Sequence, residues 1–139
     1  MKTQDIFKQV EFEIIDLHQY FQNWFTGKVE EQSYTRVENA LDNNFQLIHP
    51  SGLINDRKTV LENIRKSYNS TEELNMWVED IDSRILGEFV LSTYYECHKS
   101  EAKQTRRIST AIFSFDLTSI KWMHVHETWC ETQKENDQT

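Results

Sequence analysis

The segment from Thr105 to Glu131 constrains the fold most, because it reads as two β-strands joined by one short turn. Asp116 to Ser119 forms the predicted turn, since short polar side chains there can hydrogen-bond the nearby backbone. The runs on both sides are rich in β-branched and aromatic residues, which favour strands. A two-residue loop and a four-residue loop both give the same pairing, with Phe115 opposite Ile120. The sequence therefore predicts a single register for this hairpin.

That register sorts the side chains of the hairpin onto two faces, because successive residues in a strand point to opposite sides. On the first face two large rings meet at one end, and small residues lie opposite two histidines at the other. We expect this face to be a packed core that opens into a cavity beside the histidines. Its members are Arg107, Ser109, Ala111, Phe113 and Phe115 opposite Thr128, His126, His124, Trp122 and Ile120.

The second face of the hairpin is also too apolar to be fully exposed to water. Its members are Ile108, Thr110, Ile112 and Ser114 opposite Glu127, Val125, Met123 and Lys121. A sheet that is apolar on both faces needs two covers. We expect helices over the first face and a partner subunit, in a homodimer, over the second.

The composition restricts the class of protein. A chain of 139 residues favours a single domain, expected at 1–131, that buries its core without cross-links. A net charge of −8 argues against binding to duplex nucleic acid, which needs a basic surface. Cys97 and Cys130 have no metal-binding spacing and indicate reduced thiols. Acidic residues in the first apolar segment argue against a signal peptide, and no apolar run reaches membrane-spanning length, so we expect a cytoplasmic protein.

The remainder of the chain predicts helices followed by strands. Apolar residues at steps of three and four predict a long first helix over 4–26, which Gly27 ends in a left-handed conformation. Two further helices are expected over 34–42 and over 57–70, the latter capped by Asp56. Strands are expected at 45–49, 77–85 and 88–99, ahead of the hairpin, and the polar residues 132–139 are expected to fray. Helices segregated from an antiparallel sheet make an α+β fold.

The order helix, helix, FQLIHPSG, helix and then strands ending in WMHVHET resembles the SnoaL-like/DUF4440 branch of the NTF2-like superfamily. The likeness rests on Phe45 to Gly52, on Arg107 with its strand and on Trp122 to Thr128. It implies a cystatin-like cone, in which three N-terminal helices pack on a strongly curved mixed or antiparallel sheet of about four to six strands. It also implies a pocket between the sheet and the helices, and homodimerisation through the outer face of the sheet.

His124 and His126 are the candidate catalytic residues, because they are two apart on one strand and point the same way. An imidazole exchanges protons near neutrality, so one interpretation is acid–base catalysis. The other is that both are half-buried histidines bonded to Ser109, Thr128 or the backbone. A zinc site needs a third ligand, for which His49, Glu96 or His98 could be proposed, but no spacing demands one of them, so we expect no metal. No Gly-rich phosphate loop is present, so we expect no cofactor.

The expected ligand site surrounds the histidines. Arg107 can hold a carboxylate or enolate oxygen, and the alternative is an ion pair with Glu131 or Glu96. Tyr95 supplies a phenol, with Tyr94 in its place if Gly87 shifts the register. The predicted ligand-binding residues are Arg107, Ser109, Tyr95, Phe113, Trp122 and Trp24, the last from the apolar stripe of the first helix.

Two further residues are given no catalytic role by the sequence. Glu127 falls on the opposite face from the histidines. His18 is interpreted as a histidine on the surface of the first helix, and the alternative is that it lies at the mouth of the pocket beside Leu17 and Phe21. Three functions remain open. The first is binding of a small molecule in an apolar pocket. The second is an isomerase, cyclase or hydrolase that uses a pocket histidine as proton shuttle, and the third is a dimerisation module without catalysis.

Overall fold

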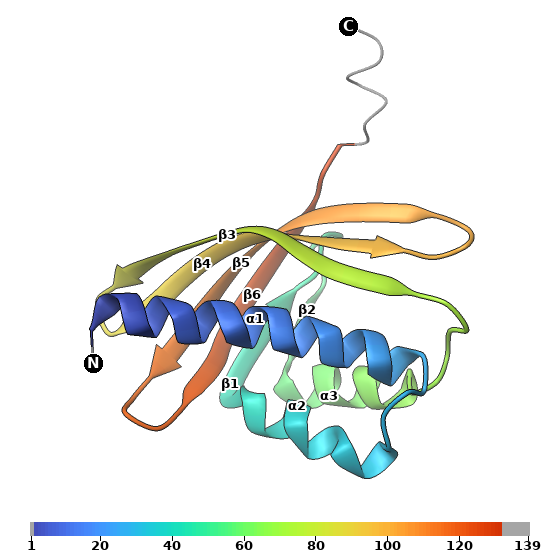
Figure 1. Ribbon diagram of the computed structural model, residues 1–139, viewed down its shortest axis with the longest axis horizontal. Coiled ribbons are helices and arrows are strands. Elements are labelled where there is room, and N and C mark those ends of the chain that lie inside the picture. Colours follow the sequence, from blue (N-terminus) through green and yellow to red (C-terminus); the bar gives the residue numbers. More distant parts are fainter. Residues whose placement is uncertain (1, 132–139) are drawn as a thin grey trace, which may run out of the picture.

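The computed structural model describes residues 2–131, and these form helices on one side of a mixed β-sheet (Figure 1). The predicted frayed tail at 132–139 lies outside the described residues. The helices are α1 (Thr3–Phe25), the 3₁₀ helix η1 (Glu31–Tyr34), α2 (Thr35–Ala40) and α3 (Arg57–Lys66). The strands are β1 (Leu41–Ile48), β2 (Ile54–Asp56), β3 (Asn75–Leu86), β4 (Phe89–Lys99), β5 (Gln104–Phe115) and β6 (Ile120–Trp129).

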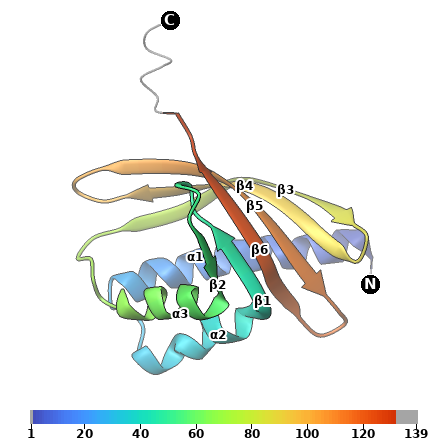
Figure 2. The same ribbon diagram turned by 180° about the vertical axis from the view of Figure 1, so that it is seen from behind.

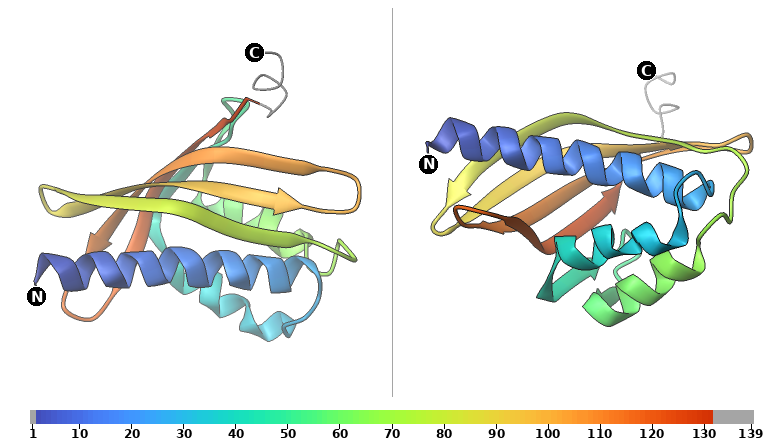
Figure 3. Two further views of the ribbon diagram at one scale, coloured as in Figure 1. Left: turned by 45° about the horizontal axis from the view of Figure 1, so that its top comes forward. Right: turned by 60° about the horizontal axis from the view of Figure 1, so that its bottom comes forward.

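The described strands form one six-stranded sheet in the order β2-β1-β6-β5-β4-β3. Among these described strands, β1 and β6 pair in parallel and the other neighbouring pairs are antiparallel. The long helix α1 runs across the sheet near β3, while α2 and α3 lie together by β1 and β2 (Figures 1 and 2). Seen from below, all three helices cover the same face (Figure 3). The predicted α+β class, with three helices and a mixed sheet, is confirmed.

The helices form where the sequence predicts them, but two of them are shorter than predicted, and α3 ends at Lys66 instead of near residue 70. The apolar stripe of α1 is buried from Ile6 to Trp24, and Gly27 ends the helix at φ +72° as expected. Asp56 caps α3 by accepting a hydrogen bond from the Thr59 backbone N–H at 2.9 Å. The second helix is shorter than predicted, because the chain leaves α2 at Ala40 and enters β1 to pair with β6.

The β5–β6 hairpin keeps the predicted register only near its turn. Phe113 pairs with Trp122 as expected, and their ring centroids lie 4.4 Å apart. The register then shifts, so that Ile112 pairs with His124 and Met123 becomes the extra residue of a β-bulge. A shift by one residue exchanges the two faces of a strand.

The bulge reverses the predicted orientation of β6 from His124 onward. Val125 and Glu127 face the helices, opposite Ala111 and Ser109. His124 and His126 lie on the outer face of the sheet, and the prediction that they face the interior is wrong. The helix-covered face thus carries a carboxylate where imidazoles were expected.

The orientation of β4 also differs from the prediction. Tyr94 pairs with Ser109 on the helix-covered face. Tyr95 pairs with Ile108 on the outer face, where the Arg106 guanidinium lies 3.8 Å from the centre of the tyrosine ring. Tyr94 is therefore the inward tyrosine, which is the alternative that the sequence left open. Within the described residues, no helix is both long and apolar enough to span a membrane.

Candidate functional site

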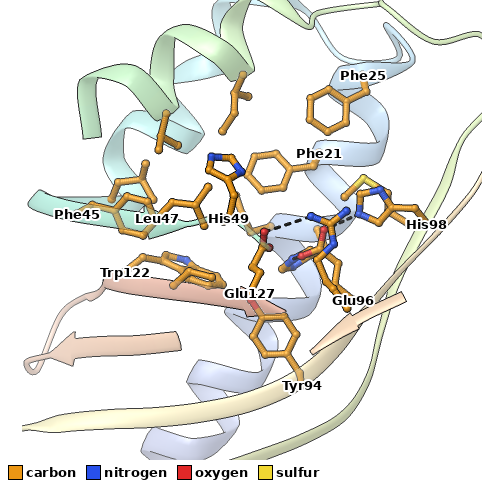
Figure 4. Close-up of a pocket in the computed structure, with 18 residues that line it drawn as sticks. Phe21, Phe25, Phe45, Leu47, His49, Tyr94, Glu96, His98, Trp122 and Glu127 are labelled. Atoms are coloured by element: carbon orange, nitrogen blue, oxygen red, sulfur yellow. Dashed lines mark hydrogen bonds and ion pairs between the residues drawn. The ribbon is translucent and has the colours of Figure 1, made fainter. Parts of the chain in front are cut away.

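A cavity of about 220 Å³ lies between the helices and the inner face of the sheet (Figure 4). Its walls are mostly apolar: Phe21 and Phe25 come from α1, Phe45 and Leu47 from β1, and Trp122 from β6. Buried polar side chains gather at the end formed by β4, β5 and β6. Apolar walls with a few convergent polar groups are typical of small-molecule sites.

The buried carboxylate of Glu96 anchors the polar end. Its Oε1 accepts a hydrogen bond from His18 Nε2 at 2.9 Å, and its Oε2 accepts one from His98 Nε2 at 2.5 Å. His18 Nδ1 lies 2.7 Å from the Ile14 carbonyl oxygen. Both partners of His18 are acceptors, so both ring nitrogens must carry protons when Glu96 is ionised. The geometry therefore describes a buried imidazolium–carboxylate ion pair.

Arg107 and Glu127 form the second polar pair of the cavity. Arg107 Nη1 donates to Glu127 Oε1 at 3.2 Å, and the Trp129 ring lies 4.6 Å from the guanidinium carbon. Arg107 Nε is buried and has no hydrogen-bond partner among the described residues. An unpaired buried donor is costly, so this nitrogen is a natural contact for an acceptor atom on a ligand.

The two carboxylates of the cavity have very different proton affinities. Burial alone would raise the pKa of Glu96, but His18, His98 and Arg107 outweigh it and hold that pKa well below the usual range. Burial, reinforced by the negative charge of Glu96, raises the pKa of Glu127 to about 7 in spite of Arg107. Burial would lower the pKa of His18, but its ion pair with Glu96 raises it. The site thus holds one fixed anion and one group that exchanges protons near neutrality.

Two other polar side chains border the cavity. The Tyr94 phenol stays protonated, because burial and then the nearby carboxylates raise its pKa well above 10. His49 lies near the β1 side of the cavity, where its Nε2 accepts a hydrogen bond from the Asn55 side-chain amide at 2.8 Å. This bond places the proton of a neutral His49 on Nδ1. Among residues 2–131, no group of three or more histidine, cysteine or acidic side chains has the arrangement of a metal site.

The structure brings together only some of the residues that the sequence singled out. Arg107 and Trp122 line the cavity. Ser109 is fully buried next to it, and its hydroxyl has no partner within the described chain. Phe113 and Trp24 face inward but are core residues that do not line the cavity, and the Trp24 indole donates to the Ile64 carbonyl.

The candidate catalytic histidines and Tyr95 lie outside the cavity. They belong to the outer face of the sheet, as the register shows. Burial and the neighbouring His126 lower the pKa of His124. A role for either histidine in chemistry inside the cavity conflicts with this placement.

Sequence reasoning missed Glu127 and Glu96 as cavity residues. Its preferred interpretation of His18 as a surface histidine is wrong, because His18 is 4% exposed and lines the cavity. One signal for the bulge was present, because Trp122 and Val125 are both apolar and are three positions apart, with another apolar residue, Met123, between them. In a regular strand, residues three apart point to opposite faces, so both can face the core only if an extra residue intervenes. No comparable signal in the sequence brings His18 next to Glu96, which is 78 positions away.

Comparison with known proteins identifies the family of this chain. Residues 10–131 match the family described as the C-terminal part of sucrose-6-phosphate phosphohydrolase. The chain belongs to this family. No curated protein matches it. The NTF2-like fold expected from the sequence is confirmed, whereas the SnoaL-like branch within it remains a prediction.

Solved structures similar to this chain share its fold at low sequence identity. An NTF2-like protein of unknown function from Pseudomonas aeruginosa has 20% identity and a TM-score of 0.83, with 88% of this chain and 98% of that chain covered. An NTF2-like protein from Cytophaga hutchinsonii has 16% identity and a TM-score of 0.69, covering 94% and 100%. A putative Ca/calmodulin-dependent kinase II association domain from Exiguobacterium sibiricum has 14% identity and a TM-score of 0.62, covering 95% and 97%. At these identities the likeness establishes the fold alone.

Proposed function

We propose that the protein binds a compact, largely apolar small molecule in the cavity between the sheet and the helices. The observation that carries the proposal is the buried Arg107 Nε, which has no hydrogen-bond partner within residues 2–131 and lies at the polar end of an otherwise apolar cavity. A volume of about 220 Å³ exceeds the roughly 150 Å³ of an engineered cavity that accepts benzene. The cavity therefore suits a ligand with one ring and a short polar substituent.

The name of the family describes part of a sugar-phosphate hydrolase, but the ligand proposed here follows from the cavity walls. A sugar presents hydroxyl groups on most of its surface, and walls made of Phe21, Phe45 and Leu47 cannot hydrogen-bond them. Burying unpaired hydroxyl groups is unfavourable. We therefore place an apolar ring, and not a sugar, against these walls. The expected cytoplasmic location remains part of the proposal.

The binding proposal is tested by filling the cavity. Monocyclic aromatic probes are screened by thermal shift, and binding is then measured by NMR titration of the full chain. Leu47→Phe adds volume inside the cavity, so it is expected to weaken binding at least tenfold. Leu91→Phe makes the same change on the outer face of β4 and serves as the matched control. The proposal is overturned if no probe binds, or if both variants bind as tightly as the wild type.

A proton-transfer enzyme is the second candidate, and the pKa of about 7 for Glu127 favours it. A buried base that titrates near neutrality beside an arginine can remove a proton from carbon while the guanidinium stabilises the oxyanion that forms. A relationship to the SnoaL-like branch, which implies isomerases, cyclases and hydrolases, would be consistent with this chemistry. In this candidate Glu127 takes the role that the sequence assigned to His124 or His126.

Hydrogen–deuterium exchange tests the enzymatic candidate without a known substrate. Small cyclic ketones are incubated with the protein in D₂O, and loss of the α-proton signal is followed by NMR. Glu127→Gln is expected to reduce the exchange rate at least a hundredfold. Glu131→Gln, an exposed residue just beyond β6, is the control. Exchange no faster than in buffer for every ketone removes this candidate.

We also propose that the outer face of the sheet forms a homodimer. Phe89 is 36% exposed and Ile108 is 37% exposed on this face, and the orientation of His124 and His126 adds two more rings to it. Large apolar side chains that are more than a third exposed on one face of a sheet are candidates for an interface. Sedimentation of Ile108→Lys is expected to show a monomer, and Ile15→Lys on the exposed side of α1 should leave the dimer intact. A monomeric wild type overturns the proposal.

A further inference from the structure

A second, smaller cavity of about 150 Å³ lies beside the first, at the end of the sheet next to the β4–β5 loop. Arg107 and His98 line both cavities. A ligand group placed in the side cavity would therefore touch the same two side chains that close the polar end of the main cavity. The remaining walls are Leu74, Ser100, Lys103, Thr105 and Trp129.

The side cavity is basic in an acidic protein. The chain carries 23 acidic and 15 basic residues, yet none of the described residues that line this cavity is acidic. Lys103 and Arg107 supply positive charge, and Ser100 and Thr105 supply hydroxyl groups. Lys103 has no carboxylate within ion-pair distance among residues 2–131. Two cations with two neighbouring hydroxyls form a set of donors that suits an oxyanion.

Arg107 is held in a position to serve both cavities. Its Nη1 donates to Glu127 on the side of the main cavity, and the Trp129 ring lies 4.6 Å from its guanidinium carbon. Its Nε is buried and has no acceptor in the described part of the chain. A planar guanidinium that uses one donor on Glu127 still has donors for a second anion, and it binds carboxylate or phosphate oxygens in pairs.

We propose that the side cavity binds the oxyanion group, a carboxylate or a phosphate, of a ligand whose apolar ring occupies the main cavity. This inference rests on the proposed binding function and adds a charge class to the ligand. Lys103 and Arg107 bind the anionic oxygens, and the ring lies against the apolar walls between α1 and β1. The ligand is thus an aromatic or alicyclic acid or phosphate monoester, and not a neutral molecule.

Three probes with the same ring test the head group. 3-Phenylpropanoate, 3-phenylpropanamide and 2-phenylethyl phosphate are titrated into the full chain at fixed ionic strength and followed by NMR. The acid or the phosphate ester is expected to bind about tenfold more tightly than the amide, because only they form charge-assisted bonds. The tighter of the two anions identifies the head group. Equal affinity of the amide and both anions overturns the inference and leaves the binding proposal standing.

Two lysine variants, Lys103→Gln and Lys99→Gln, test whether the preference for an anionic head group arises in the side cavity. Both variants remove one positive charge from an exposed lysine near the β4–β5 loop, but only Lys103 lines the side cavity. Lys103→Gln is expected to remove most of the preference for an anion, while Lys99→Gln keeps it. An equal loss in both variants would show a general charge effect and reject the site.

A titration with inorganic phosphate distinguishes failure of the binding proposal from failure of the oxyanion site. If none of the ring probes binds, the proposed binding function fails. Phosphate is then titrated alone, and shifts of the Lys103 and Thr105 amides that disappear in Lys103→Gln retain the oxyanion site by itself. Absence of those shifts rejects the site as well.

Discussion

Arg107 Nη1 donates a hydrogen bond to Glu127 Oε1 at 3.2 Å, and the two side chains reach each other diagonally across β5 and β6. Their side chains are 16% and 8% exposed, so the pair lies almost outside water. The arginine does not keep the carboxylate fully ionised, because burial and Glu96 raise the pKa of Glu127 to about 7. The pair therefore combines the proposed ligand contact of Arg107 with a carboxylate that titrates near neutrality.

Glu127 should make the protein less stable as the pH rises. Its pKa is about 7 in the folded state and 4.5 for an ordinary glutamate, so between these values the folded state holds the proton more tightly. Its contribution to stability is fully present below pH 4.5 and is lost as the pH rises through about 7. The loss amounts to about 3 kcal/mol.

Glu127→Gln isolates this contribution, because a glutamine stays neutral at every pH. Urea unfolding of the variant and the wild type is compared from pH 4 to pH 8. The variant is expected to become the more stable protein at pH 8, by up to about 3 kcal/mol. Parallel stability curves for the two proteins would show that Glu127 has an ordinary pKa.

The ion pair between His18 and Glu96 should be a main source of stability. Replacing one partner leaves a buried charge, which typically costs about 3–5 kcal/mol, so His18→Gln is expected to lower the free energy of unfolding by that order. His124→Gln, on the outer face, should change it by less than about 0.5 kcal/mol. The raised pKa of His18 gives stability that is present below its ordinary 6.5 and is lost as the pH rises through the folded value. The cost of His18→Gln should therefore shrink at high pH, and nitrogen NMR should show both ring nitrogens protonated at pH 6.

Replacing the outer-face histidines should leave ligand binding unchanged. His124→Ala and His126→Ala alter side chains on the face of the sheet away from the cavity. The affinity of a ring probe that binds the wild type is expected to stay within about twofold in NMR titrations, a difference of roughly 0.4 kcal/mol. A tenfold loss in either variant would place an imidazole in the site and contradict the observed register.

Deleting the bulge residue should be tolerated better than deleting a neighbour. Without Met123, a regular ladder still places Val125 opposite Ala111, as in the intact protein. Without Val125, the regular ladder places His124 opposite Ala111, in a buried position that offers no partner. An unpaired buried polar group costs about 1–3 kcal/mol, so the Met123 deletion should be the more stable of the two by that amount in urea unfolding. The reverse order would mean that Met123 itself holds the strand in place.

Local sequence patterns were sufficient to predict the helices and strands of this fold. The buried stripe of α1, the Asp56 cap of α3 and the Phe113–Trp122 pair all follow from residues a few positions apart or across one turn. The exterior position of Tyr95 and the interior position of Glu127 do not follow from such local patterns. Each depends on which face of a strand meets the helices, and a shift of one residue exchanges the faces.

The sequence by itself determined the α+β class, the order of the elements and the inward position of Arg107, because periodicity and turn chemistry are encoded by near neighbours. Only the tertiary structure decided that a bulge at Met123 turns Glu127 inward and the two histidines outward. It also decided that His18 meets Glu96, from an element far away along the chain. The physical reason is that β6 pairs with β1 and β5 at once, and its bulge lets Trp122 and Val125 both reach the core beneath the helices.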